Sequence, residues 1–120
     1  MYVSSAVVPV LVVRFFRTES GAEPVRLWLR DLPAQERKTI GEDMKTVQFG
    51  WPLGMPLVDH LDGDIWEVRI RLERRIARIL FVAEEGAMVL LHGFIKKDQR
   101  TPKAELDLAR DRLKQLRRRK

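Results

Sequence analysis

The chain has 120 residues, of which 45% are hydrophobic and 33% charged, and its formal net charge is +6. This length suits a single domain spanning residues 1–120, and the composition is that of a folded chain. The absence of cysteine excludes disulfides, thiolate metal sites and a cysteine nucleophile, and two histidines are too few for a histidine-rich metal site. We therefore expect no metal and no cofactor. The basic charge favours nucleic acid as a partner over an anionic membrane surface or an acidic protein.

The N-terminal half predicts one strand followed by a helical hairpin. Residues 1–8 are interpreted as a loose leader. The apolar run over residues 6–13 falls far short of the roughly 20 residues that span a bilayer, so it is interpreted as part of a strand. Residues 10–17 are β-branched and aromatic, which predicts a strand. Two short amphipathic helices should follow, the first beginning near Pro24 and the second ending near Gly50.

The C-terminal half predicts an ordered loop, three strands and a final helix. Residues 50–64 are rich in proline and glycine and predict the loop. Residues 65–72 alternate apolar and charged side chains, which predicts a half-buried strand with a charged exposed face. Residues 75–83 and 87–97 are mostly apolar, and the short turns between these stretches favour antiparallel hairpins.

A final helix should begin at Thr101 as N-cap and Pro102 as its first residue, with residues 117–120 as a basic tail. The predicted order is β-α-α-β-β-β-α. The fold class is therefore α+β, with one antiparallel sheet, an N-terminal helical hairpin and a C-terminal helix.

Several cationic side chains interrupt the predicted strands. If the strands are sequential antiparallel neighbours, Arg69, Arg78 and one or both of Lys96 and Lys97 could converge on one face of the sheet. Strand parity, which the sequence does not fix, decides which of them share that face. Arg78 lies in an apolar strand, where a charge is unfavourable unless it faces a cleft or a partner. The alternative is a cross-strand ion pair between Arg78 and Glu67. The two interpretations can both hold.

A convergent cationic cluster suits phosphate chemistry. In RNA cleavage the 2′-oxygen attacks the adjacent phosphorus, and arginine and lysine can stabilise the charge that develops on the phosphoryl oxygens without a metal. His92 is a candidate for proton transfer, although a hydrogen-bonded core histidine is the commoner case in such an apolar setting. His60, on the predicted loop, could reach a ligand. Further candidate RNA contacts are Arg71, Lys103, Arg110 and Lys114.

Three stretches resemble the phage-derived, HigB-like branch of the RelE/ParE toxin superfamily. They are LDGDIWEVRI, RIARILFV and LLHGFIKKDQRTPKAELDLARDRL, and the Lys-Lys-x-x-x-Thr-Pro piece is the most specific part. The resemblance covers residues 61–116. It implies a RelE-like fold and the toxin half of a type II toxin–antitoxin pair, a cytoplasmic endoribonuclease that cleaves mRNA in the ribosomal A site.

The same resemblance implies a cognate antitoxin, often with a helix-turn-helix domain through which the complex binds operator DNA. By position it implies that Arg69, Arg78, Lys96 and Lys97 line the RNA-facing surface, with His92 and His60 as lesser candidates. The chain departs from many relatives at Phe81, where the wider superfamily often has a tyrosine or a catalytic histidine. Phenylalanine can stack on a base but cannot transfer a proton.

The residues by themselves are also compatible with two other functions. A ParE-like protein would use the same fold to inhibit DNA gyrase by binding, without cleaving RNA. A non-catalytic module would bind nucleic acid or an antitoxin only. The cationic cluster favours the nuclease.

Overall fold

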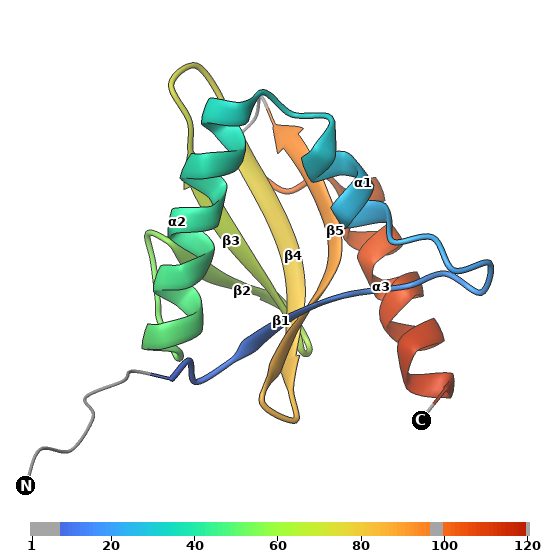
Figure 1. The fold of residues 1–120 in the computed structure, drawn as a ribbon. Coiled ribbons are helices and arrows are strands. Elements are labelled where there is room, and N and C mark those ends of the chain that lie inside the picture. Colours follow the sequence, from blue (N-terminus) through green and yellow to red (C-terminus); the bar gives the residue numbers. More distant parts are fainter. Residues whose placement is uncertain (1–7, 97–99, 120) are drawn as a thin grey trace, which may run out of the picture.

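The computed structural model of the chain describes residues 8–96 and 100–119. Within them the order is β1 (Val12–Phe15), α1 (Pro24–Arg30), α2 (Ala34–Gly50), β2 (Val58–Asp62), β3 (Ile65–Arg71), β4 (Ile76–Glu84), β5 (Ala87–Lys96) and α3 (Lys103–Arg118). The strands form one sheet in the order β1-β5-β4-β3-β2. Helices α1 and α2 cover one face of this sheet and α3 lies against the other (Figure 1). The predicted α+β class is confirmed.

The sheet is mixed rather than wholly antiparallel, because β1 pairs with β5 in the parallel direction. The other three pairings are antiparallel. The chain leaves β1, runs through both N-terminal helices and reaches the far edge of the sheet before it returns strand by strand. That route places the first and last strands side by side, which short-range patterns in the sequence do not encode.

A fifth strand, β2, lies where the sequence predicted only a loop. It pairs with β3 so that Val58 faces Val68 and His60 faces Trp66. Its residues alternate weakly and include several polar side chains, as is common on the edge of a sheet, so the pattern carries little strand signal. His60 therefore lies on a strand, and the prediction that placed it on a loop was wrong.

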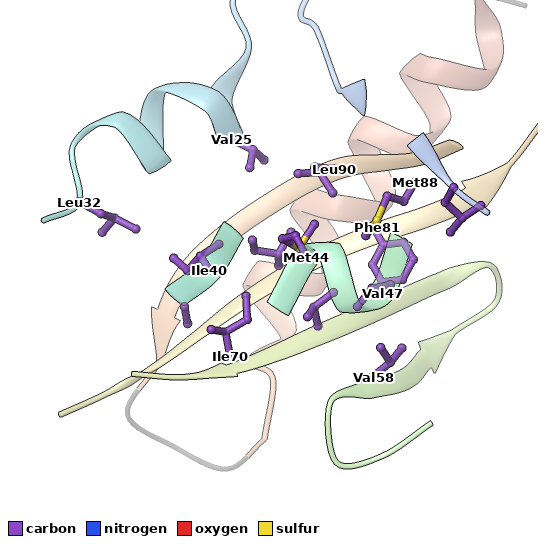
Figure 2. Packing of buried hydrophobic residues seen from close by; sticks show 14 of the residues in the cluster. Val25, Leu32, Ile40, Met44, Val47, Val58, Ile70, Phe81, Met88 and Leu90 are labelled. Carbon is purple, nitrogen blue, oxygen red and sulfur yellow. The ribbon is translucent and has the colours of Figure 1, made fainter. Parts of the chain in front are cut away.

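Apolar side chains fill both sides of the sheet. On one side α1 and α2 bring Val25, Ile40 and Met44 against Phe81 and Leu90 (Figure 2). On the other side Ala109 and Leu113 of α3 pack against residues of β4 and β5. The central strand β4 is thus buried on both faces, which explains its nearly continuous apolar sequence.

The helix and turn boundaries follow the local signals only in part. Helix α2 ends at Gly50 as predicted, although it has 17 residues and is not short. The turn between β4 and β5 holds Glu85 and Gly86 with φ of 53° and 74°, the left-handed backbone of a tight hairpin. No helix in the described ranges is both long and apolar enough to cross a membrane.

The two ends of α3 differ from the prediction. Pro102, not Thr101, is the N-cap residue, and no side chain caps this end. Arg117 and Arg118 lie inside the helix, so the residues interpreted as a basic tail are partly helical. Of the predicted leader, only Val8 lies within the described residues.

Candidate functional site

The register of three central strands brings the predicted cations together. Arg69 of β3 lies opposite Arg78 of β4, and Arg78 lies opposite Phe94 of β5. Lys96 is two residues further along β5 and therefore points to the same face, the one that α3 covers. Lys97 lies outside the described residues.

A buried carboxylate lies at the centre of this cluster. Glu67 is fully buried, and its Oε1 accepts hydrogen bonds from Arg69 Nε at 2.9 Å and Arg78 Nη1 at 2.9 Å. Its Oε2 accepts a hydrogen bond from the hydroxyl of Thr101. The cross-strand pair of Arg78 and Glu67, one of the two alternatives left open by the sequence, is present.

This network corrects the prediction that β3 has a charged exposed face. Thr101 lies just before α3, and its hydroxyl donates a hydrogen bond to Oε2 of Glu67. The same hydroxyl accepts a hydrogen bond from Arg78 Nη1 at 3.4 Å. A buried carboxylate is tolerated only when opposite charges and hydrogen bonds replace its water. Here two guanidinium groups and one hydroxyl do so, and Thr101 serves the network instead of capping the helix.

The cations of the cluster differ in accessibility. Arg78 and Lys96 are only 3% and 6% exposed. Arg69 is 29% exposed, and its Nη2 donates to Asp59 of β2 at 3.0 Å. At least two carboxylates, Glu67 and Asp59, therefore oppose the cluster, and the sequence had offered only Glu67 as an alternative partner. Of the three described members, Arg69 is the best placed to meet a ligand from outside.

His92 is bound by α3 on both ring nitrogens. Arg112 Nη1 donates to Nδ1 at 3.4 Å, so the proton of the neutral ring lies on Nε2, which is 2.6 Å from Glu105 Oε2. The ring also stacks on Phe94 with centroids 5.3 Å apart. Burial lowers the pKa of His92 below its usual 6.5, and the hydrogen bond to Glu105 opposes this only in part. His92 is thus a hydrogen-bonded core histidine.

The remaining candidates are dispersed. His60 Nε2 lies 2.6 Å from the carbonyl oxygen of Gly63. Lys103 pairs with Asp107 at 2.9 Å, and Arg110 bridges Asp62 and Asp107 at 2.8 Å each. Arg71 and Lys114 are exposed. Among the described residues, no group of histidine, aspartate and glutamate side chains is arranged to hold a metal ion.

Sequence reasoning named Glu67 as the alternative partner of Arg78 but missed the other residues that organise this site. Thr101 was assigned to the helix cap and Asp59 fell within the predicted loop, and Glu105 was not considered as a partner of His92. A signal was present for Glu67, since it alternates with Arg69 along β3. For the others the contact spans a long stretch of chain, 34 residues between Thr101 and Glu67.

Fold and site together define a class: a small α+β protein whose mixed sheet holds a carboxylate–arginine network beside its C-terminal helix. A family profile described as phage derived protein Gp49-like (DUF891) matches residues 27–114, from α1 to the last turns of α3. The chain belongs to this family, which is associated with RelE-like toxins of toxin–antitoxin pairs and so implies an antitoxin partner. A comparison with curated protein sequences found no match.

Proposed function

We propose that this chain is the toxin of a type II toxin–antitoxin pair, of the HigB-like branch of the RelE/ParE superfamily, and that it is an endoribonuclease. In this proposal it acts in the cytoplasm on mRNA bound to the ribosome, without metal or cofactor. The family association and the net charge of +6 support it. The observation that carries it is the convergence of Arg69, Arg78 and Lys96 on one face of three adjacent strands.

The proposed chemistry is a transesterification. The 2′-oxygen loses its proton and attacks the adjacent phosphorus, the bond to the 5′-oxygen breaks, and the products carry a 2′,3′-cyclic phosphate and a 5′-hydroxyl. Arg69, the most exposed of the three described members, would contact the phosphoryl oxygens on which negative charge develops. Arg78 and Lys96 lie deeper and would strengthen the positive potential at that point.

Glu67 has a positioning role in this mechanism, because one of its oxygens holds the guanidinium groups of both arginines. His92 and His60 have lesser roles, since both ring nitrogens of His92 and the Nε2 of His60 contact protein partners. The outer cations Arg71, Lys103, Arg110 and Lys114, together with Lys97, would add sequence-independent attraction to RNA. The antitoxin would silence the toxin and carry the complex to operator DNA.

One observation favours a second candidate function. Arg78 and Lys96 are almost fully buried, which suits a protein that binds its target without cleaving RNA. A ParE-like gyrase inhibitor and a non-catalytic nucleic-acid-binding module would both act in this way, by binding a target without cleaving RNA. They differ from the nuclease in leaving cellular messages intact.

The deciding experiment maps mRNA 5′ ends shortly after induction of the wild type, Arg69→Ala and Arg30→Ala. Arg30 is the control, because it is an arginine on α1 whose side chain is 72% exposed and away from the cluster. We expect new, codon-phased ends with the wild type and Arg30→Ala, and their loss with Arg69→Ala. These ends should carry 5′-hydroxyls, so they should be ligated to an adaptor only after phosphorylation.

Folding of Arg69→Ala must be checked by circular dichroism, and Arg69→Lys keeps a charge near Glu67 if the alanine variant unfolds. Growth arrest with intact messages would reject the nuclease and favour the second candidate. New ends that persist in a folded Arg69→Ala protein would remove Arg69 from the proposed site.

A further inference from the structure

An apolar groove lies on the face of the sheet opposite the Glu67 network. It has a volume of about 340 Å³ and is open between the two N-terminal helices and the edge strand β1. The apolar part of its lining comes from four elements and consists of Val13, Phe15, Leu29, Ile40, Met44 and Leu90. The polar side chains of the lining are Arg37, Lys45 and Gln48, and Gln48 Nε2 donates to the carbonyl oxygen of Leu11 at 3.2 Å.

Helix α2 presents a glycine to this groove. Gly41 lies within the helix, where glycine is less favourable than alanine. A Cβ added at Gly41 would meet no atom of the described residues within 4 Å, so packing inside the chain does not require the missing side chain. The position does leave room for the backbone of another molecule to approach α2 closely.

The charges along the groove are of one sign. Arg37 and Lys45 flank Gly41 one helical turn to either side, and no acidic residue of the described chain lines the groove. Arg37 is held in place, because its Nη1 donates to the carbonyl oxygen of Arg30 at 3.2 Å and to that of Leu32. Glu36 of the same helix instead pairs with Arg75 at 2.6 Å, outside the groove.

We propose that this groove binds an amphipathic helix of a partner protein, with apolar residues on one side and acidic residues flanking them. Arg37 and Lys45 are eight residues apart on α2, about 12 Å at 1.5 Å per residue, which matches two turns of a docked helix with anchors at i, i+3/i+4 and i+7. The identification of this partner as the antitoxin rests on the proposed function. The groove itself and its positive charge do not depend on the proposed function.

A second copy of this chain is a poor occupant. Its net charge of +6 opposes self-association through a basic groove. Its most amphipathic helix, α3, already buries Ala109 and Leu113 against its own sheet. Charge complementarity therefore selects an acidic partner of another sequence.

The test measures binding of two synthetic helices to the intact chain by fluorescence anisotropy. Both are stapled on the solvent face, since free helices of about 15 residues are only marginally stable. They share one leucine stripe and differ only in their flanking residues, glutamate in one and lysine in the other. The protein variants are Gly41→Leu, which fills the groove, and Thr46→Leu, a control on an exposed face of α2. Lys45→Glu tests the charge.

We expect the wild type to bind the glutamate helix at least roughly tenfold more tightly than the lysine helix. Gly41→Leu should weaken this binding by roughly tenfold or more, Thr46→Leu should leave it unchanged, and Lys45→Glu should reduce the preference for glutamate. Binding of neither helix, preference for lysine, or insensitivity to Gly41→Leu would overturn the proposal. So would a dimer in sedimentation velocity that Gly41→Leu dissociates, because a second copy would then occupy the groove.

The outcomes for this groove and for the nuclease are separable. Mapping of mRNA ends does not depend on the groove, so cleavage without helix binding would overturn only the docking proposal. Helix binding without cleavage would overturn the nuclease and leave the docking surface in place.

Discussion

Glu67 shows how one residue can determine both the stability and the chemistry of this face of the sheet. It is fully buried and charged, and its partners come from its own strand, from β4 and from the segment before α3. Removal of one partner from a buried ion pair leaves the other charge without the interaction that offset its desolvation. The site is therefore sensitive to changes that look conservative in sequence.

Glu67→Ala should lower the free energy of unfolding by about 3–5 kcal/mol, because Arg78 loses its carboxylate while it stays buried. Thr101→Val should have a smaller effect of about 1.5–3 kcal/mol, the range for a hydrogen bond to a charged group. Thr46→Val, on the exposed face of α2, should change stability by no more than about 0.5 kcal/mol. Urea denaturation measures all three. Equal effects of the two threonine substitutions would contradict the network.

His92 predicts a dependence of stability on pH. Burial lowers its pKa in the folded chain below the usual value of 6.5, so the unfolded chain binds the proton more readily. The stabilising contribution is complete above pH 6.5 and is lost as the pH falls through the folded-state pKa. His92→Gln should remove this part of the slope in denaturation midpoints below pH 6.5.

Titration of the His92 ring by NMR measures the same quantity directly. A folded-state pKa at or above 6.5 would contradict the prediction. It would also make His92 a better candidate for proton transfer than its burial suggests.

At the scale of elements, α1 packs closely against β5 at Gly93. A Cβ at Gly93 would lie 2.5 Å from Cε3 and Cζ3 of Trp28, closer than atoms of packed side chains approach. The missing side chain thus allows the indole ring to rest directly on the strand. This contact belongs to the face of the sheet that α1 and α2 cover.

Gly93→Ala should therefore displace Trp28 and lower the stability of the chain by about 1–3 kcal/mol, as overpacked core substitutions do. Gly54→Ala is the matched control, because a Cβ there would meet no described atom within 4 Å and should change stability by about 0.5 kcal/mol or less. Thermal unfolding followed by tryptophan fluorescence compares them. A shift of similar size for both would show that Trp28 moves without strain.

Helix α3 is attached to the sheet by apolar packing more than by its ion pairs. Arg110 and Arg117 form pairs with Asp62 and Asp64, but these side chains are well exposed and solvent screens them. Ala109 and Leu113 are buried against β4 and β5, and the Thr101 hydroxyl binds Glu67 at the start of the helix. Apolar burial and this one buried contact are the stronger terms.

At the scale of the whole molecule, the positive charge predicts salt-sensitive binding to RNA. Each cation that contacts a phosphate releases a counterion, which makes the logarithm of the binding constant fall with the logarithm of salt concentration. Lys114 is exposed on α3 and is a proposed RNA contact.

Lys114→Gln should reduce the magnitude of this slope by about 0.7 for single-stranded RNA, while Lys38→Gln on α2 should not change it. Titration of a labelled oligonucleotide at several salt concentrations measures both. Equal slopes for the two variants would show that α3 does not face the RNA.

Most of the elements follow from local sequence. The period-2 alternation of β3, the apolar run of β4, the tight turn at Glu85 and Gly86 and the amphipathic spacing of the helices each depend on residues close together in the chain. Such signals predicted the fold class. They also suggested that Arg69, Arg78 and one or both lysines converge, but the strand register, which comes from the structure, decides that Arg69, Arg78 and Lys96 share one face.

Only the tertiary structure decided the remaining features, because they depend on contacts between distant residues. The polar edge strand β2 forms by pairing with β3, and β1 lies parallel to β5 because the helices carry the chain across the sheet. The Thr101 hydroxyl donates a hydrogen bond to Glu67 and does not cap α3. A buried carboxylate without hydrogen-bond partners is more unfavourable than an uncapped helix end that is exposed to solvent. The groove beside Gly41 likewise exists only where four elements meet.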